Sequence, residues 1–136
     1  MPDPPQDVSQ KAVSSRGGDH SGLGQWGERK AAEYLQGQGY RLLDTRFRCR
    51  EGEIDLILVR EPYLCFVEVK LRKDADLAQA RESVTPAKQR KVRMAALRYL
   101  SQHPSRLQPR FDVVEVYAPQ GVETVLPTIY HLENAF

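Results

Sequence analysis

The residues best suited to chemistry are three acids and a lysine in the middle of the chain: Glu53, Asp55, Glu68 and Lys70. Two carboxylates held close together repel each other and cannot both stay ionised without cost. A divalent cation would remove that conflict, because Mg²⁺ is commonly held by one or two carboxylates together with water and substrate phosphates. The alternative is that Lys70 or solvent neutralises the acids. A Glu-x-Lys tripeptide alone does not decide between a metal site and a neutralised patch.

Two predicted β-strands position these four residues. The runs 52–59 and 63–70 are short, apolar and rich in Val, Ile, Leu and aromatic residues. Pro62 cannot donate to a strand ladder, so it belongs in the turn between them. If Glu61 and Pro62 form a two-residue loop, the register places Asp55 opposite Glu68 and Glu53 opposite Lys70. Directly opposed side chains share one face of a sheet, with Cβ atoms roughly 4.5–5.5 Å apart.

The whole chain has the composition of one globular domain. It has 136 residues, of which 28% are charged and 40% hydrophobic. No apolar run approaches the roughly 20 residues of a membrane-spanning helix, and the N-terminus lacks the apolar stretch of a secretion signal. Cys49 and Cys65 are too few for a disulfide scaffold, which indicates a reducing cytoplasm. Residues 1–20 predict a disordered tail, and residues 21–136 the domain.

A first helix is predicted from Leu23, where apolar residues begin to recur every three or four positions. Ser21 can cap its start, and Gly37 and Gly39 end it. Glu28 falls at the edge of the apolar stripe, from which it can reach across the rim of a sheet. It is either part of a functional site or a boundary glutamate that pairs with a basic neighbour.

A second helix is predicted from Thr85-Pro86 to Leu100, with threonine as the N-cap. When its apolar stripe is extended toward the N-terminus, the positions reached are Lys88 and Gln89. They lie in the first turn, where free N–H groups favour anions. With Lys91 and nearby arginines they form a basic helix face that could contact nucleic acid. The net charge of only +2 does not itself indicate a nucleic-acid-binding protein, and such a face can also be ordinary solvated surface.

The remaining pattern predicts an α/β sandwich around a mixed sheet. Residues 40–47 and 110–117 predict further strands, and 125–132 an edge strand interrupted by Pro127. Residues 71–84 predict a loop or a short helical piece near the site. The three histidines, His20, His103 and His131, have no metal-ligand spacing and are expected at the surface.

The order and spacing of these motifs resemble the PD-(D/E)XK nuclease superfamily, and in particular its YraN-type branch, bacterial proteins similar to archaeal Holliday junction resolvases. The resemblance extends from about Leu23 to Phe136. It rests on Gly27-Glu28, Gly39-Tyr40, Glu53-Ile54-Asp55, Phe66-Val67-Glu68-Val69-Lys70 and Arg110-Phe111-Asp112. The superfamily's proline-aspartate is replaced here by Ile54-Asp55, and the aspartate itself is kept.

The resemblance implies a restriction-endonuclease-like αβββαβ core, with a mixed central sheet flanked by helices. It also implies that Asp55 and Glu68 bind Mg²⁺ or Mn²⁺, and that Glu28 holds a second metal ion or a water. Lys70 would orient the attacking water and offset phosphate charge, and Lys88 would contact the phosphate.

The function expected from these residues is metal-dependent cleavage of DNA, including branched DNA such as a recombination junction. Phosphodiester hydrolysis needs a metal ion to activate water and fixed positive charge near the phosphate. The alternative is a nucleic-acid-binding module with the same fold and little or no turnover, and a protein-interaction scaffold would leave the acids unexplained. Resemblance to resolvases also implies a symmetric dimer.

Overall fold

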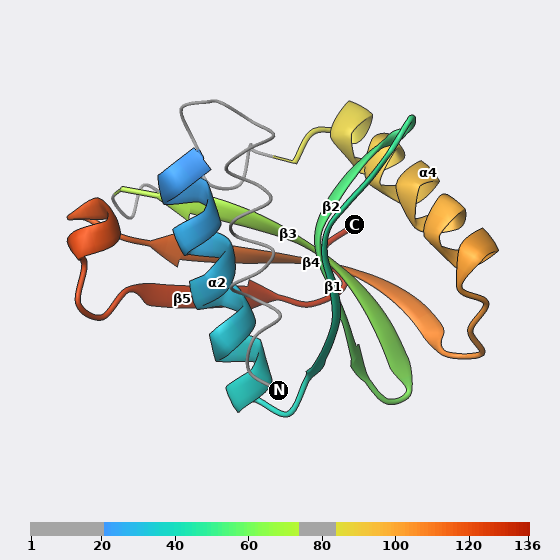
Figure 1. Ribbon diagram of the computed structural model, residues 1–136, viewed down its shortest axis with the longest axis horizontal. Helices are drawn as coiled ribbons and strands as arrows, with labels where there is room; N and C mark the ends of the chain where they lie inside the picture. Colours follow the sequence, from blue (N-terminus) through green and yellow to red (C-terminus); the bar gives the residue numbers. More distant parts are fainter. Residues whose placement is uncertain (1–20, 74–83) are drawn as a thin grey trace.

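The computed structural model describes residues 21–73 and 84–136, which form two helices, a five-stranded sheet and a short 3₁₀ turn (Figure 1). The elements are α2 (Ser21–Gly37), β1 (Arg41–Cys49), β2 (Gly52–Arg60), β3 (Tyr63–Arg72), α4 (Pro86–Gln102), β4 (Gln108–Tyr117), η1 (Gly121–Glu123) and β5 (Thr128–Leu132). The predicted αβββαβ core and its mixed sheet are confirmed.

The strands lie in the order β1-β2-β3-β4-β5, and only β3 and β4 run parallel. A parallel pair needs a long crossover connection, and α4 lies within that connection. The predicted hairpin is confirmed, because Arg60 pairs with Tyr63 around Glu61 and Pro62. The predicted edge strand is confirmed as β5, which begins just after Pro127 rather than around it.

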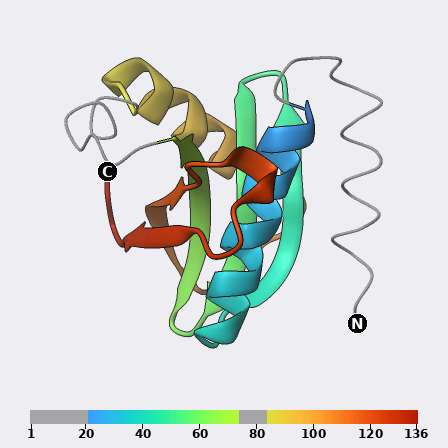
Figure 2. The same ribbon diagram turned by 90° about the vertical axis from the view of Figure 1, so that its left-hand side faces the viewer.

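The two helices cover opposite faces of the sheet, as the side view shows (Figure 2). On the first face, Trp26 and Leu35 of α2 pack against residues such as Leu56 and Val67. On the second face, the buried stripe of α4 packs against the alternate set of strand residues. Burial on both faces explains why β2 and β3 are nearly continuous apolar runs rather than alternating ones.

Both predicted helices are confirmed, with small differences at their ends. Helix α2 begins at Ser21 itself and ends before Gly39, whose φ of 97° lies in the left-handed region that glycine tolerates. Thr85 caps α4, because its hydroxyl accepts the Lys88 N–H at 3.2 Å. The α4 helix continues to Gln102, two residues past the predicted end. Among the described helices, none is long and apolar enough to cross a membrane.

Two other predictions lie wholly or partly outside the described residues. These are the tail at 1–20, which includes His20, and most of the connection at 71–84, of which β3 takes the first two residues. The first strand extends two residues further than predicted, so the turn between β1 and β2 is only Arg50 and Glu51.

Candidate metal and phosphate site at the opening between β2 and β3

The sheet opens at Asp55. Strands β2 and β3 pair from Arg60–Tyr63 to Leu56–Val67, and the pairing ends one step before Asp55 and Glu68. Hydrogen-bonded pairs alternate along an antiparallel ladder, so the next bond should join the Val69 N–H to the main chain of β2. Instead, the Val69 N–H donates to Asp55 Oδ2 at 2.8 Å. The carboxylate has therefore replaced a main-chain acceptor, and the strands separate around it.

Strand β1 is irregular at the same level. Its pairs with β2 pass from Thr45–Leu56 to Phe47–Ile54, which omits Arg46 and Asp55. Arg46 has a φ of 52°, which is uncommon for a residue with a side chain. The alternation of β2 also breaks at this level, because Ile54 faces α4 while Leu56, two residues away, faces α2. The break turns Asp55 toward the main chain of β3, away from the regular alternation of side chains.

Glu68 and Lys70 share one face of β3, as their spacing predicted. Lys70 Nζ lies 3.3 Å from Glu68 Oε2, and both side chains are largely buried. Asp55 reaches the same place from between the strands. Its pKa is raised well above the usual value by burial first, and then by the charges of Glu68 and Glu28. Three acids from three elements thus share one poorly solvated space.

Glu28 joins this space from α2, which approaches β3 closely at Gly27. A Cβ on Gly27 would lie only 3.2 Å from Leu71 Cδ1. The carboxylate of Glu28 accepts two hydrogen bonds from Arg46, at 3.1 and 3.3 Å. Even so, its pKa is raised to about 7, because burial outweighs the attraction of Arg46 and the nearby acids Glu53 and Glu68 add to the repulsion.

Glu53 does not face Lys70 as the extended register predicted. It pairs across β1 with Arg48, at 3.3 Å, and its side chain is more exposed than those of the three central acids. Its charge still raises the pKa values of Glu28 and Asp55. Glu53 therefore contributes to the field of the site from its rim.

The three predicted nucleic-acid-binding residues of α4 differ in their position. Lys88 lies beside Lys70, whose pKa is lowered by burial first and then by the hydrogen bond and charge of Lys88, against the opposing effect of Glu68. Gln89 instead donates its side-chain amide to the Val84 carbonyl at 3.1 Å. Lys91 is exposed, and its main chain lies against Gly52 at the start of β2. Of the three, only Lys88 has a contact that connects it to the acids.

The carboxylates of Asp55, Glu68 and Glu28 lie near one another without forming a complete set of ligands for a metal ion. Within residues 21–73 and 84–136, no group of three or more His, Cys, Asp or Glu side chains is placed to hold a metal ion by itself. Carboxylates that repel one another in a buried space still suit a cation that takes its remaining ligands from water and a phosphate. The arrangement places a lysine ion pair among the acids, and a second lysine, Lys88, lies beside Lys70.

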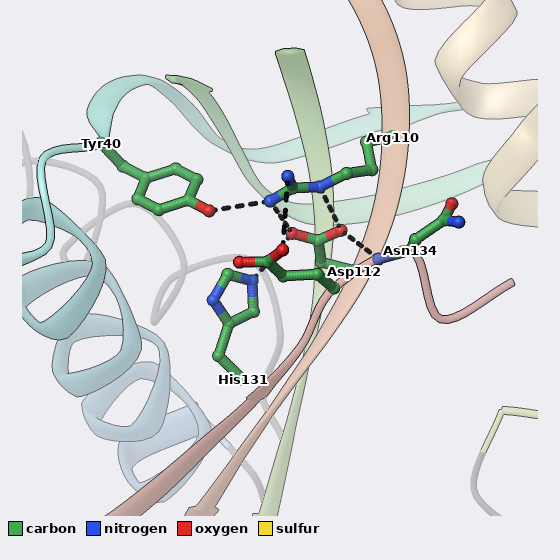
Figure 3. Close-up of polar contacts among 6 residues, drawn as sticks. Tyr40, Arg110, Asp112, His131 and Asn134 are labelled. Carbon is green, nitrogen blue, oxygen red and sulfur yellow. Dashed lines mark hydrogen bonds and ion pairs between the residues drawn. The ribbon is translucent and has the colours of Figure 1, made fainter. Parts of the chain in front are cut away.

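A second polar cluster, centred on Asp112, was not foreseen as a unit (Figure 3). Asp112 is fully buried and accepts bonds from Arg110 Nε at 3.0 Å, from Arg110 again at 2.8 Å, and from the Asn134 N–H at 2.9 Å. His131 Nε2 lies 2.8 Å from the same carboxylate. Arg110 also donates to the Tyr40 hydroxyl at 2.7 Å. The cluster joins β4 to β5, to the C-terminal segment and to the start of β1.

The surface position predicted for His131 is therefore wrong, because only 11% of its side chain is exposed. It lies on β5 beside Val114 and points toward the sheet, where Asp112 needs a partner. The prediction holds for His103, which is exposed and stacks on Tyr99. Two features of the sequence could have indicated that His131 is buried. It alternates with polar or exposed positions in the edge strand, and the neighbouring apolar strand contains an acid, Asp112.

Two more residues at the acidic opening were missed. Arg46 could have been found only as one of several arginines ahead of the hairpin, because nothing local indicates that it faces Glu28. Glu115 is buried at 4% exposure and is the direct partner of Lys70 in the parallel pairing of β3 and β4. A lone glutamate within the apolar run 113–118 was the available signal.

Fold and site together define an α/β protein with a mixed sheet whose opened strand pair holds a buried group of acids beside two lysines. The family model of the uncharacterised protein family UPF0102 matches residues 27–116, and the chain belongs to this family. Relatives described as UPF0102 proteins include one from Alkalilimnicola ehrlichii, 48% identical over 97 residues, which are 70% of this chain and 77% of the relative. Another, from Pelobacter propionicus, is 40% identical and covers 97% of this chain and 95% of its own length.

A relative from Myxococcus xanthus is 41% identical over 83% of this chain and 87% of its own. These matches confirm the family part of the resemblance. Every residue of the acidic opening, from Glu28 to Lys88, lies inside the matched segment 27–116.

Proposed function

We propose that this chain is a divalent-metal-dependent endonuclease that hydrolyses phosphodiester bonds in DNA. The observation that carries the proposal is the opening of the sheet at Asp55. A buried aspartate there takes the place of a main-chain acceptor, beside other acids that raise its pKa. An arrangement that costs stability and perturbs pKa values in one place is typical of a functional site.

The donor set fits Mg²⁺ or Mn²⁺. Both ions prefer oxygen ligands, and the carboxylates of Asp55 and Glu68 supply them, with Glu28 available for a second ion or a water. A bound ion would lower the pKa of water and stabilise the leaving oxygen. The raised pKa values of Asp55 and Glu28 have the same origin, which is burial of the carboxylates first and the charge of the neighbouring acids second.

The protein's own residues would bind and orient the other reactants. In hydrolysis, the oxygen of water bonds to phosphorus, the bond from phosphorus to one sugar oxygen breaks, and that oxygen takes a proton. Lys70, held by Glu68, orients the attacking water, and burial together with Lys88 lowers its pKa from the ordinary value, which eases proton exchange. Lys88 adds positive charge for the phosphate. Both cysteines among the described residues are free, in keeping with the reducing cytoplasm where we place this reaction.

A second candidate is a nucleic-acid-binding module without turnover. Two observations favour it: Arg46 already pairs with Glu28, and Lys70 already pairs with Glu68. If these pairs persist when DNA binds, the acids are neutralised by the protein itself and need no metal ion.

Cleavage assays on linear, flapped and four-way DNA in Mg²⁺ or Mn²⁺ separate the two candidates. We expect the parent protein to cut at least one substrate, Asp55→Asn to be inactive, and Lys70→Ala to lose about 100-fold or more in rate. Glu61→Gln is a matched control, because Glu61 is an exposed acid at the far end of the same hairpin. Tight binding of every DNA without cleavage would favour the second candidate, and full activity of Asp55→Asn would refute the first.

A further inference from the structure

A cleft of about 630 Å³ lies on the face of the sheet that carries Glu68 and Lys70, at the C-terminal ends of β3 and β4. Its walls are Lys73 just after β3, the end of β4, the first part of β5, and the connection between β4 and β5. Tyr117 lies at its base, buried, and donates its hydroxyl to Glu115 Oε1 at 3.3 Å. The cleft is therefore built on a fixed side chain rather than on a loop alone.

Exposed apolar and aromatic side chains line the rest of the cleft. Tyr130 is 49% exposed and meets Tyr117 edge to face, with ring centroids 5.5 Å apart. Val125 and Leu126 are 92% and 86% exposed. Large apolar side chains that are clustered and exposed to solvent often mark a binding site. Lys73 and Glu123 contribute one charge of each sign, so the cleft itself does not attract a strongly charged group.

The cleft continues directly from the acidic opening. Lys70 pairs with Glu115 on β4, and Glu115 pairs with Tyr130 on β5, so the three side chains lie in one row on one face. Neighbouring strands are about 4.8 Å apart, which places Tyr130 roughly 10 Å across the sheet from Lys70. Lys73, three residues beyond Lys70 on the same segment, is at the rim of the cleft. A nucleic-acid strand whose phosphate lies at Lys70 would thus bring an adjoining nucleotide to the cleft.

We propose that this cleft receives an unpaired nucleobase of the bound DNA strand, which stacks on Tyr130 against Val125 and Leu126. The proposal rests on the proposed function and adds a substrate class to it. A base has a flat apolar face and polar edges, which suits a cleft of aromatic and aliphatic walls with one charge of each sign. A base that is stacked and paired in a duplex cannot enter, so the cleft selects DNA with a single-stranded segment next to the cleaved bond.

The test compares the binding of a fluorescently labelled single-stranded oligonucleotide with that of the blunt duplex of the same sequence. Base stacking on an aromatic side chain contributes about 1–3 kcal/mol, so Tyr130→Ala should weaken single-strand binding by about 5-fold to 150-fold. Duplex binding should stay within about twofold, and Tyr130→Phe, which keeps the ring, should bind like the parent. Tyr34→Ala is the matched control, since Tyr34 is a partly exposed tyrosine on α2, which covers the opposite face.

Leu126→Ser supplies a second variant that leaves β5 intact, and it should weaken single-strand binding without changing thermal stability. Equal losses for single strand and duplex, or no loss for either variant, would overturn the cleft as a base site. A parent dimer that Tyr130→Ala turns into a monomer in sedimentation would identify the surface as an interface between two copies instead. If the parent binds neither DNA, the proposed function fails as well. If the parent binds and cuts while Tyr130→Ala behaves like the parent, only the cleft proposal fails.

Discussion

Asp55 and Asp112 are both buried aspartates on neighbouring parts of one sheet, and their surroundings have opposite effects. Asp112 accepts bonds from Arg110, His131 and the Asn134 N–H. Burial alone would raise its pKa, but the hydrogen bonds from His131 and Arg110 lower it below the usual value. Asp55 accepts a hydrogen bond from the Val69 N–H, and its pKa is raised by burial and by neighbouring acids.

The contrast indicates that Asp112 stabilises the fold, whereas Asp55 is kept in an unfavourable position by the rest of the fold. A buried charge with full hydrogen bonding and a counter-ion is a stable structural element once formed. A buried charge left among like charges costs stability, and proteins retain such costs mainly at functional sites. An aspartate in the same sheet thus has two different roles, and its hydrogen-bonding and charged neighbours determine which one it has.

The largest expected effect follows the loss of charge at Asp112. Asp112→Asn leaves Arg110, with only 10% of its side chain exposed, without its buried counter-ion. Breaking a buried ion pair from one side typically costs roughly 3–5 kcal/mol, and we expect a loss of that order in the free energy of unfolding, measured by urea titration. The same substitution at Asp55 should cost nothing without metal. Equal losses at the two positions would remove the distinction between the clusters.

The next effect concerns metal binding. Mn²⁺ at 100 times its Kd should stabilise the parent by about 2.7 kcal/mol, the mass-action value for one site. Asp55→Asn should abolish this gain while it keeps or raises the stability of the metal-free protein, because it relieves repulsion by Glu68 and Glu28. Thermal unfolding with and without Mn²⁺ measures both. Asp55→Asn protein that still gains stability from Mn²⁺ would show that the ion binds elsewhere.

Local patterns were enough to predict most of the fold. The Thr85 cap, the Pro62 turn and the apolar runs each act within a few residues, and the structure confirms the helices, the hairpin and the edge strand built on them. The element ends moved by one or two residues, because fraying and pairing with neighbours decide them. Register within the hairpin was also predictable as far as Leu56–Val67, because a two-residue loop determines it, but the predicted pairs Asp55–Glu68 and Glu53–Lys70 do not form because the strands separate there.

The candidate site was predictable in its members and less so in its geometry. The spacing of Glu68 and Lys70 was sufficient to place them on one face, and the structure brings Glu28 beside them as the helix edge suggested. The turn of Asp55 toward β3 was not predictable, because it accompanies a break in the pairing of β2 with both neighbouring strands. Contacts between segments distant in the chain leave no pattern in either segment alone.

A smaller effect should appear in the pH dependence of stability. The folded pKa of Glu28 is raised from 4.5 to about 7, and that of Asp55 is raised as well, so the folded protein binds more protons than the unfolded chain between these values. Metal-free stability should therefore fall as pH rises from about 4.5 to 7, by at most about 1.4 kcal/mol per pH unit for each proton. The lowered pKa of Asp112 acts in the opposite direction and only near its usual value of 3.8.

Urea titrations at several pH values, in the presence of a chelator, measure this slope. Glu28→Gln should reduce it, and comparison with the parent cancels the contribution of every group that both proteins share. A metal-free parent whose stability rises over the same range would show that the acids are not in conflict. In that case the contrast between Asp55 and Asp112 would rest on hydrogen bonding alone.

The smallest effect tests whether the acidic opening extends to the start of α4. Lys88 is exposed, yet it lies close enough to Lys70 to lower the pKa of that lysine. If Lys88 contacts a DNA phosphate, Lys88→Ala should reduce the slope of log affinity against log salt by about 0.9. Between 50 and 200 mM salt, the parent should then lose roughly 3.5 times more affinity than the variant. Arg106→Ala is the charge-matched control, because Arg106 is an exposed cation beyond the opposite end of α4. Equal slopes for the parent, Lys88→Ala and Arg106→Ala would confine the functional charge to the strands and leave the basic face of α4 as solvated surface.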